Sequence, residues 1–139
     1  MQRETTSDGT VVVKSERCTI SFRRLGPGVV LMRIVGYDSG EFGNAPFEEM
    51  HALMAGFTPA EVFMDLSEAF GARTQVREEW TNWFRSNQAV LRRANILVGS
   101  KYIEIAVAMA KLFSRTGELI QLYSSAAAFQ EAIARAIAA

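Results

Sequence analysis

The 139-residue sequence has few of the side chains that form disulfides, metal clusters or acid–base pairs. It contains one cysteine, Cys18, one histidine, His51, and three prolines. A single cysteine excludes an internal disulfide and any multi-cysteine metal cluster. Such sparse cysteine use fits a reducing compartment. We therefore expect a cytoplasmic protein without bound metal or cofactor.

The sequence also lacks an excess of charge of either sign and any long hydrophobic run. Its 15 basic and 15 acidic residues cancel, which argues against bulk attraction to nucleic acid or to an anionic membrane. Residues Met1–Gly9 are polar, unlike the core of a signal peptide, and the longest helical apolar run is Ile105–Ala110. That run is far shorter than the roughly 20 residues that span a bilayer. We expect no nucleic-acid partner and no membrane insertion.

The order of hydrophobic patterns predicts an α/β fold. The length fits one domain, with residues 1–9 as a flexible N-terminal segment and 10–139 as the domain. Short β-branched or apolar runs predict six strands, at Thr10–Lys14, Cys18–Arg23, Val29–Val35, Val62–Ser67, Asn95–Ser100 and Leu119–Ser124. The last three end in glycine or hydroxyl residues and alternate with helical patterns, which indicates parallel strands. Ligands and partners bind beyond the carboxyl ends of such strands.

Helical periodicity predicts four helices. The first follows Asn44 as a cap and ends before Thr58-Pro59, the second spans about 74–94, the third about 101–114, and the fourth follows Ser124 or Ser125. Trp80 and Trp83 lie in the apolar stripe of the second helix, which favours core packing over a ligand-stacking platform. Asn87 projects from the same stripe and is either hydrogen-bonded inside or open to a cavity.

The third helix is apolar over most of its circumference. Lys101, Glu104, Lys111 and Arg115 form only a narrow polar strip. One sheet contact cannot cover so much apolar surface. Either neighbouring helices cover the remainder, or a second protein does, which would make the helix a homodimer or partner surface.

Few residues are candidates for chemistry. His51 has no assignable nucleophile, which favours a structural role. Asp65, at the end of an apolar strand, is an acid or base or caps the following turn. Ser100 and Lys101 lie at a helix amino terminus, where backbone amides attract anions, although the pattern favours an ordinary Ser100 cap. None of these forms a catalytic constellation.

The order of predicted elements, with Phe63-Met64-Asp65-Leu66-Ser67 and Val98-Gly99-Ser100-Lys101-Tyr102, resembles the STAS domain of anti-anti-sigma factors and the wider SpoIIAA-like set. The resemblance covers about Thr10 to Ala136. It implies a central mixed sheet with wound βα units and four helices. It also implies a bacterial, non-enzymatic signalling regulator that binds a partner kinase or switch protein.

The resemblance further implies a phosphorylated serine at the start of the second helix, within an Asp-Ser-Ser-Gly type of stretch. The corresponding segment here is Gly71–Gln75, in which Thr74 is the only hydroxyl. Thr74 is therefore the phosphorylation candidate, because helix amides and the adjacent Arg73 and Arg77 would stabilise a phosphate. Its simpler role is to cap the helix.

Two hypotheses about function follow. The first is a protein-interaction module that uses the strand ends and the start of the second helix, with six binding candidates: Asp65, Ser67, Arg73, Arg77, Ser100 and Lys101. The second is a carrier of a small molecule or lipid, similar to Sec14-type domains, with an apolar pocket lined by the first helix, the third helix and the strand ends. If the protein were an enzyme, Asp65, Ser67 or Ser100 would be the residues to test.

Overall fold

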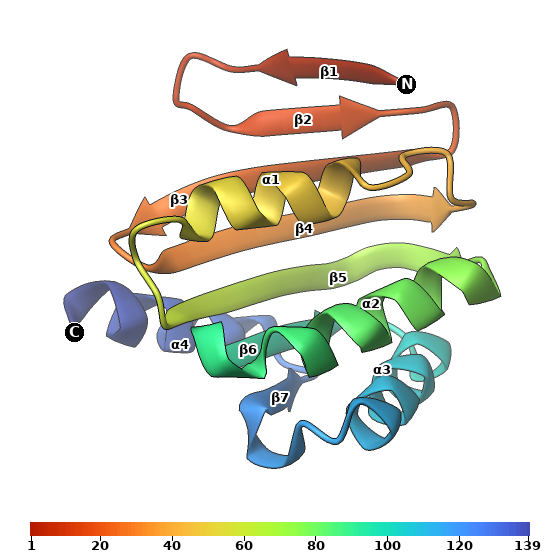
Figure 1. The fold of residues 1–139 in the computed structure, drawn as a ribbon. Helices are drawn as coiled ribbons and strands as arrows, with labels where there is room; N and C mark the ends of the chain where they lie inside the picture. The colour runs from red at the N-terminus through yellow and green to blue at the C-terminus, as the bar shows by residue number, and fades with distance from the viewer.

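A seven-stranded mixed sheet with four helices makes up the fold in the computed structural model, which describes residues 1–139 (Figure 1). The strands are β1 (Gln2–Thr5), β2 (Val11–Lys14), β3 (Cys18–Gly26), β4 (Val29–Asp38), β5 (Ala60–Ala72), β6 (Leu91–Val98) and β7 (Ile120–Tyr123). The helices are α1 (Ala45–Met54), α2 (Thr74–Ser86), α3 (Lys101–Ser114) and α4 (Ala126–Ala138). Two short 3-10 turns, Gln88–Val90 and Gly117–Leu119, precede β6 and β7.

The strands lie in the sheet in the order of the chain, β1 to β7. β1 to β4 pair antiparallel, as expected for strands joined by short turns, and β4 to β7 pair parallel. Each parallel connection contains one helix, which the crossover between parallel strands requires. The predicted mixed α/β sheet with four helices is confirmed.

Three helices cover one face of the sheet and the fourth covers the other (Figure 1). Parallel crossovers are nearly always right-handed. Since all three here step in the same direction along the sheet, α1, α2 and α3 fall on the same face. Only α4, which follows the last strand, packs on the opposite face.

Strand alternation supplies each face with its own core. A cluster of 21 buried hydrophobic residues lies between the sheet and α1–α3, and a smaller cluster of 6 lies under α4. In β5, Met64 belongs to the large cluster and its neighbour Phe63 to the small one. Phe63 meets Phe129 of α4 edge-on, with the ring centroids 5.6 Å apart. Neighbouring residues of β5 therefore lie in different cores.

The N-terminal segment differs from its predicted role as a flexible tail. Residues Gln2–Thr5 form β1, paired antiparallel with β2, and Arg3 forms an ion pair with Glu49 of α1 at 3.0 Å. All four residues of β1 are exposed. Because this edge strand is held by backbone hydrogen bonds rather than by apolar burial, it has no hydrophobic pattern to detect.

The second helix is shorter than predicted. α2 ends at Ser86, and Asn87 is its C-cap residue, whose side-chain amide donates to the Trp83 carbonyl oxygen at 2.8 Å. The expectation that Asn87 is hydrogen-bonded inside is confirmed. The following residues Leu91–Ala94 begin β6 instead of continuing the helix. The apolar side chains of Leu91 and Ala94 suit either a helix or a strand, and pairing with β5 selects the strand. The first helix likewise ends early, at Met54.

Candidate functional site

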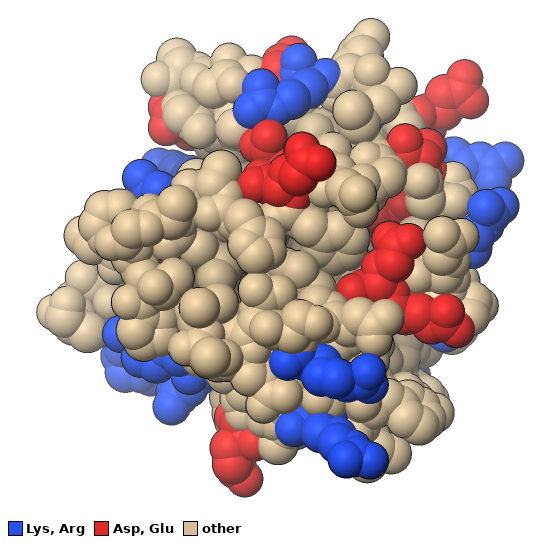
Figure 2. Space-filling view, in the orientation of Figure 1, with Lys and Arg blue, Asp and Glu red and all other residues tan.

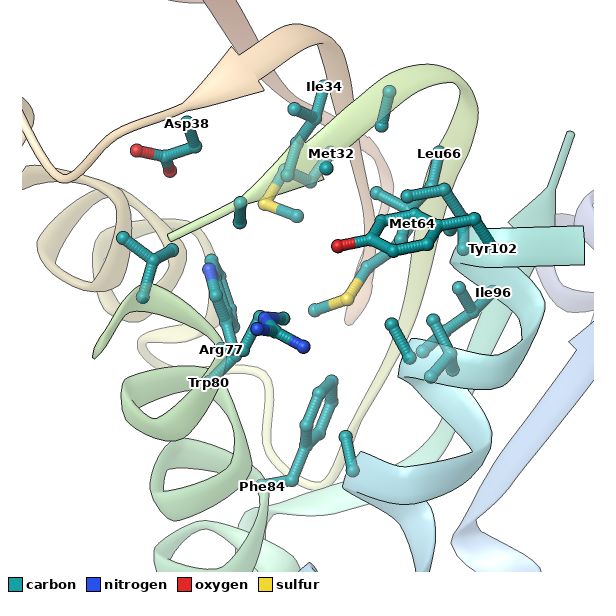
Figure 3. A pocket seen from close by; sticks show the side chains of 18 of the residues that line it. Met32, Ile34, Asp38, Met64, Leu66, Arg77, Trp80, Phe84, Ile96 and Tyr102 are labelled. Carbon is teal, nitrogen blue, oxygen red and sulfur yellow. The ribbon is translucent and has the colours of Figure 1, made fainter. Parts of the chain in front are cut away.

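An apolar pocket opens between α2 and α3 above the sheet (Figure 3). Of its 19 lining residues 16 are hydrophobic, and they come from β4, β5, β6, α2, α3 and the first residue of β7. Its labelled apolar side chains are Met32, Ile34, Met64, Leu66, Trp80, Phe84, Ile96 and Tyr102. The predicted apolar pocket exists, but its helices are α2 and α3. No residue of α1 lines it, so the prediction that the first helix forms a wall was wrong.

Small residues create this space. α3 presents Ala106 and Ala110, one helical turn apart, where it faces α2, and β5 contributes Ala69 and Gly71. Side chains at these spacings share a helix face, so the two alanines leave a gap that larger residues would fill. The cavity volume is about 110 Å³, close to the roughly 150 Å³ of an apolar cavity that binds benzene. The pocket fits one ring or a segment of an alkyl chain.

Two charged residues interrupt the apolar lining. Asp38, the last residue of β4, is only 4% exposed, and its Oδ1 accepts a hydrogen bond from the Gly40 amide at 2.9 Å. Burial raises the pKa of the Asp38 carboxyl; the Gly40 hydrogen bond opposes this shift, and the nearby charges of Glu41 and Glu79 add to it. Arg77 is exposed and donates to Thr74 Oγ1 at 3.0 Å.

Asp65 and Ser67 lie on the opposite face of the sheet from the pocket. Met64 and Leu66 point into the pocket, so their alternate neighbour Asp65 faces the α4 side. The Ser67 amide and hydroxyl both donate to Asp65 Oδ1, at 2.9 and 2.6 Å, and Arg33 Nε lies 3.6 Å from Asp65 Oδ2. Asp65 therefore caps the following bend, the simpler of the two roles considered.

The chain just after the end of β6 meets β5 where Gly99 lies against Ser67. A Cβ atom added to Gly99 would lie 2.2 Å from the Ser67 carbonyl oxygen, so only glycine permits this approach. Ser67 is not the tip of its strand, however, because β5 continues to Ala72 beside the end of β4. Ser100 Oγ accepts from the Ile103 amide at 3.2 Å as the N-cap of α3, and Lys101 pairs with Glu104 at 2.6 Å.

The start of α2 brings Thr74 and Arg77 together but leaves the helix without a side-chain cap. Arg73 is the N-cap residue and makes no capping hydrogen bond. Thr74 accepts from Arg77 instead of capping the helix. The six predicted binding residues therefore do not form one site. Asp65 and Ser67 face the α4 side, Ser100 and Lys101 begin α3, and Arg73 and Arg77 lie at the start of α2.

The histidine and cysteine have structural surroundings. His51 Nε2 accepts a hydrogen bond from the indole N–H of Trp83 at 3.1 Å. Burial, followed by the charges of Asp38 and Glu41, raises the pKa of the Cys18 thiol to about 12, so it stays protonated at neutral pH. Of the two tryptophans, Trp83 is in the core as predicted, whereas Trp80 is partly exposed and lines the pocket.

The residues that sequence analysis missed are Asp38, Trp80 as a pocket residue, and the alanines of α3. Asp38 is the last residue of β4 and lies beyond Val35, where the sequence pattern predicted the end of this strand. The Ala106 and Ala110 spacing was visible within the third helix. Its meaning depended on knowing that this side of α3 faces α2.

The outer side of α3 remains uncovered. Ile105, Met109, Leu112 and Phe113 are exposed, Leu112 by 68%, and they form one stripe at helical spacing. We call these four residues the α3 stripe. Sequence analysis left two alternatives for the apolar surface of this helix. Neighbouring helices do not cover the α3 stripe, so that alternative is wrong for these four residues. Figure 2 shows that most of the face that carries α1–α3 is uncharged and that charged groups of both signs are scattered over the rest.

The strand order and helix placement define a small α/β domain with a SpoIIAA-like fold. A solved structure with this fold, an uncharacterised protein of the DUF3478 family from Shewanella loihica PV-4, matches with a TM-score of 0.60 and 16% identity. The match covers 87% of this chain and 98% of that chain. The predicted SpoIIAA-like, STAS-type fold is confirmed. No family model and no curated protein matches the sequence. None of the four helices is long and apolar enough to cross a bilayer.

Proposed function

We propose that this protein is a non-enzymatic binding module that holds a small apolar ligand, or the apolar part of an amphiphile, between α2 and α3. The observation that carries the proposal is the pocket itself, a partly enclosed cavity with 16 hydrophobic residues among 19. Ligand sites are typically concave and apolar, with a few polar groups that orient the ligand. Asp38 and Arg77 are those polar groups here.

The surroundings of the reactive side chains support binding rather than catalysis. His51 uses Nε2 to accept the Trp83 hydrogen bond, and the Cys18 thiol is buried. Asp65 is held by Ser67 on the far face of the sheet. A general base needs a reacting group within hydrogen-bond reach, and these groups lie outside the pocket lining.

Filling the pocket from α3 tests the proposal. Ala106→Phe places a ring between α2 and α3, whereas Ala108→Phe makes the same change at an exposed position of the same helix. Native mass spectrometry of protein purified from cells, followed by calorimetric titration with 1-decanol, measures occupancy. We expect wild type and Ala108→Phe to bind and Ala106→Phe to lose at least about tenfold in affinity, since its ring occupies the ligand volume.

Circular dichroism and thermal unfolding of both variants check that the fold is retained. If Ala106→Phe fails to fold, Ala110→Leu provides a less disruptive change at another residue that lines the pocket. Absence of binding in wild type, or equal binding by the pocket-filled and control variants, would refute the carrier proposal.

A second candidate is a STAS-type regulatory module that binds a protein partner. The α3 stripe favours it, because an exposed apolar stripe on a helix is typical of an interaction surface. The partner would be a kinase or switch protein, as the family resemblance implies, or a second copy of this chain. This second candidate uses the exposed α3 stripe, whereas ligand binding uses the side of α3 that lines the pocket.

A further inference from the structure

One end of the pocket contains a carboxylate and an indole N–H that lack full hydrogen-bond partners. Asp38 is 4% exposed, and the only hydrogen bond of its carboxylate is the one that Oδ1 accepts from the Gly40 amide. The indole of Trp83 donates to His51, but that of Trp80 has no acceptor. Figure 3 shows the nitrogen of the Trp80 ring on the side nearer Asp38.

These free polar atoms face space rather than other protein atoms. No fully buried side-chain nitrogen or oxygen lacks a hydrogen-bond partner in this structure. The Trp80 nitrogen and the second Asp38 oxygen must therefore reach solvent or a cavity. Both residues line the pocket, and both also line a much smaller adjoining cavity of about 10 Å³. Burying a polar group without a partner is costly, so a ligand polar group that reached these atoms would gain hydrogen bonds that the protein does not supply.

The electrostatics at this end of the pocket favour positive charge. Asp38 forms no ion pair, and the groups that act on it are the carboxylates Glu41, from the following loop, and Glu79, from α2, with the buried thiol of Cys18 on β3 beside them. Arg77 also lines the pocket, but it forms no ion pair with Asp38 and donates to Thr74 instead. A cation near Asp38 would find an uncompensated negative charge.

We propose that the pocket selects amphiphiles whose polar end is an ammonium group, bound by Asp38, or a hydroxyl group, bound by Asp38 and Trp80 together, and that it disfavours carboxylates. This inference rests on the proposed function, because the apolar chain must occupy the pocket for its head to reach this end. An ammonium donates to Asp38, and a hydroxyl donates to Asp38 while accepting from Trp80. A carboxylate is repelled by Asp38.

The hydrocarbon chain of the amphiphile then follows the apolar lining of the pocket. From Asp38 and Trp80, the wall continues past Met64 to Phe84 on α2 and Ile96 on β6 (Figure 3). The head group contributes selectivity and the chain contributes affinity. Changes at Asp38 should therefore alter the ranking of ligands more than the binding of chains in general.

Titration with three ten-carbon probes below their aggregation concentrations tests this selectivity. Decylamine and 1-decanol should bind wild-type protein more tightly than decanoate, by about tenfold, the usual effect of a charge-assisted hydrogen bond. Asp38→Asn keeps the shape and can still accept from Gly40, and it should remove the decylamine preference while changing 1-decanol affinity by less than about threefold. Trp80→Phe should weaken 1-decanol more than decylamine. Glu131→Gln removes an exposed carboxylate from α4. It is the control for nonspecific attraction of decylamine to the protein.

The outcomes separate this inference from the proposed function. If no probe binds, carriage of apolar ligands fails. If all three probes bind with equal affinity and Asp38→Asn changes none of these affinities, the polar end of the pocket holds only water. That result overturns the selectivity inference but leaves the proposal of apolar ligand binding intact. Preferential binding of decanoate that Arg77→Gln abolishes would also overturn it, by assigning the head group to Arg77.

Discussion

Asp38 combines a charged side chain with an almost fully buried position, and this combination affects stability as well as binding. Asp38 is the last residue of β4. After it, the chain turns toward α1 through a loop that contains Gly40 and Glu41. The Gly40 amide satisfies one oxygen, but no cation approaches the other. The pKa of the carboxyl is raised chiefly because burial disfavours its ionised form.

This raised pKa predicts a specific pH dependence. Below the ordinary pKa of 3.8, the carboxyl is protonated in both folded and unfolded chains, and its ionisation contributes nothing to stability. As pH rises from there through the higher pKa of the folded state, the unfolded chain ionises first, so the folded state loses stability. At neutral pH the buried charge is therefore destabilising.

Asp38→Asn should consequently stabilise the unliganded protein at pH 7, by about 1 kcal/mol, because it removes a buried, unpaired charge. Urea unfolding of both proteins between pH 3 and 8 measures the difference, which should shrink toward the acidic end. A wild-type protein that is more stable than the variant at pH 7 would show that the carboxylate has a favourable partner.

Other residue roles were more accessible to sequence reasoning. The structural assignment of His51 and the turn-capping role of Asp65 needed only the absence of a nucleophile and the position after an apolar strand. Asp38 has a similar sequence position, but the cavities that it lines are completed by Val76 and Trp80 of α2. Local patterns do not contain that distant contact.

At the scale of elements, the two helices that flank the pocket begin differently. α3 has a Ser100 side-chain cap on the Ile103 amide, whereas α2 has no capping side chain. The exposed Thr74 hydroxyl accepts from Arg77. Phosphorylation of Thr74 stays a prediction, supported by its place at the helix amino terminus and by the neighbouring arginines.

This difference predicts unequal effects of removing the two hydroxyls. Ser100→Ala should lower the free energy of unfolding by about 1 kcal/mol, the usual cost of losing an N-cap. Thr74→Ala should change it by less than about 0.5 kcal/mol, because a surface substitution without a cap has little effect. Urea unfolding at neutral pH compares the two variants. A larger loss for Thr74→Ala than for Ser100→Ala would contradict the observed capping.

Element boundaries were predictable where a local signal marks them. The cap at Ser125, whose hydroxyl accepts from the Ala128 amide at 3.2 Å, and the range of α3 agree with the sequence prediction. The end of α2 was missed because Leu91 and Ala94 continue its apolar stripe as well as they begin β6. β1 was missed because its stabilising contacts are backbone hydrogen bonds to β2.

At the scale of the whole molecule, the sequential strand order explains where the pocket lies. Three crossovers in one direction place α1, α2 and α3 side by side on one face (Figure 1). The space between α2 and α3 becomes the pocket. The α3 stripe lies opposite the buried residues Ile103 and Val107, on the side of the helix turned away from the sheet, where it stays exposed.

The α3 stripe should mediate association if the second candidate function is correct. Ile105→Glu with Leu112→Glu places two charges in the stripe, and Ile137→Glu on α4 is the control, since Ile137 is also exposed. Sedimentation should show a dimer that only the stripe variant dissociates, or affinity purification should recover a partner whose yield falls about tenfold with that variant alone, because interface charges left unpaired are costly. A monomer from which no partner depends on the stripe would refute this candidate.

The strand and helix periods in the sequence were enough to establish the α/β class and the approximate position of most elements, because these depend on local side-chain spacing. The pocket, the burial of Asp38 and the separation of Asp65 from Arg77 onto opposite faces required the folded chain. They arise from contacts among β4, α2 and α3, which are far apart in the sequence, and from crossover handedness, which places three helices on one side. Local spacing does not encode which helix faces become neighbours.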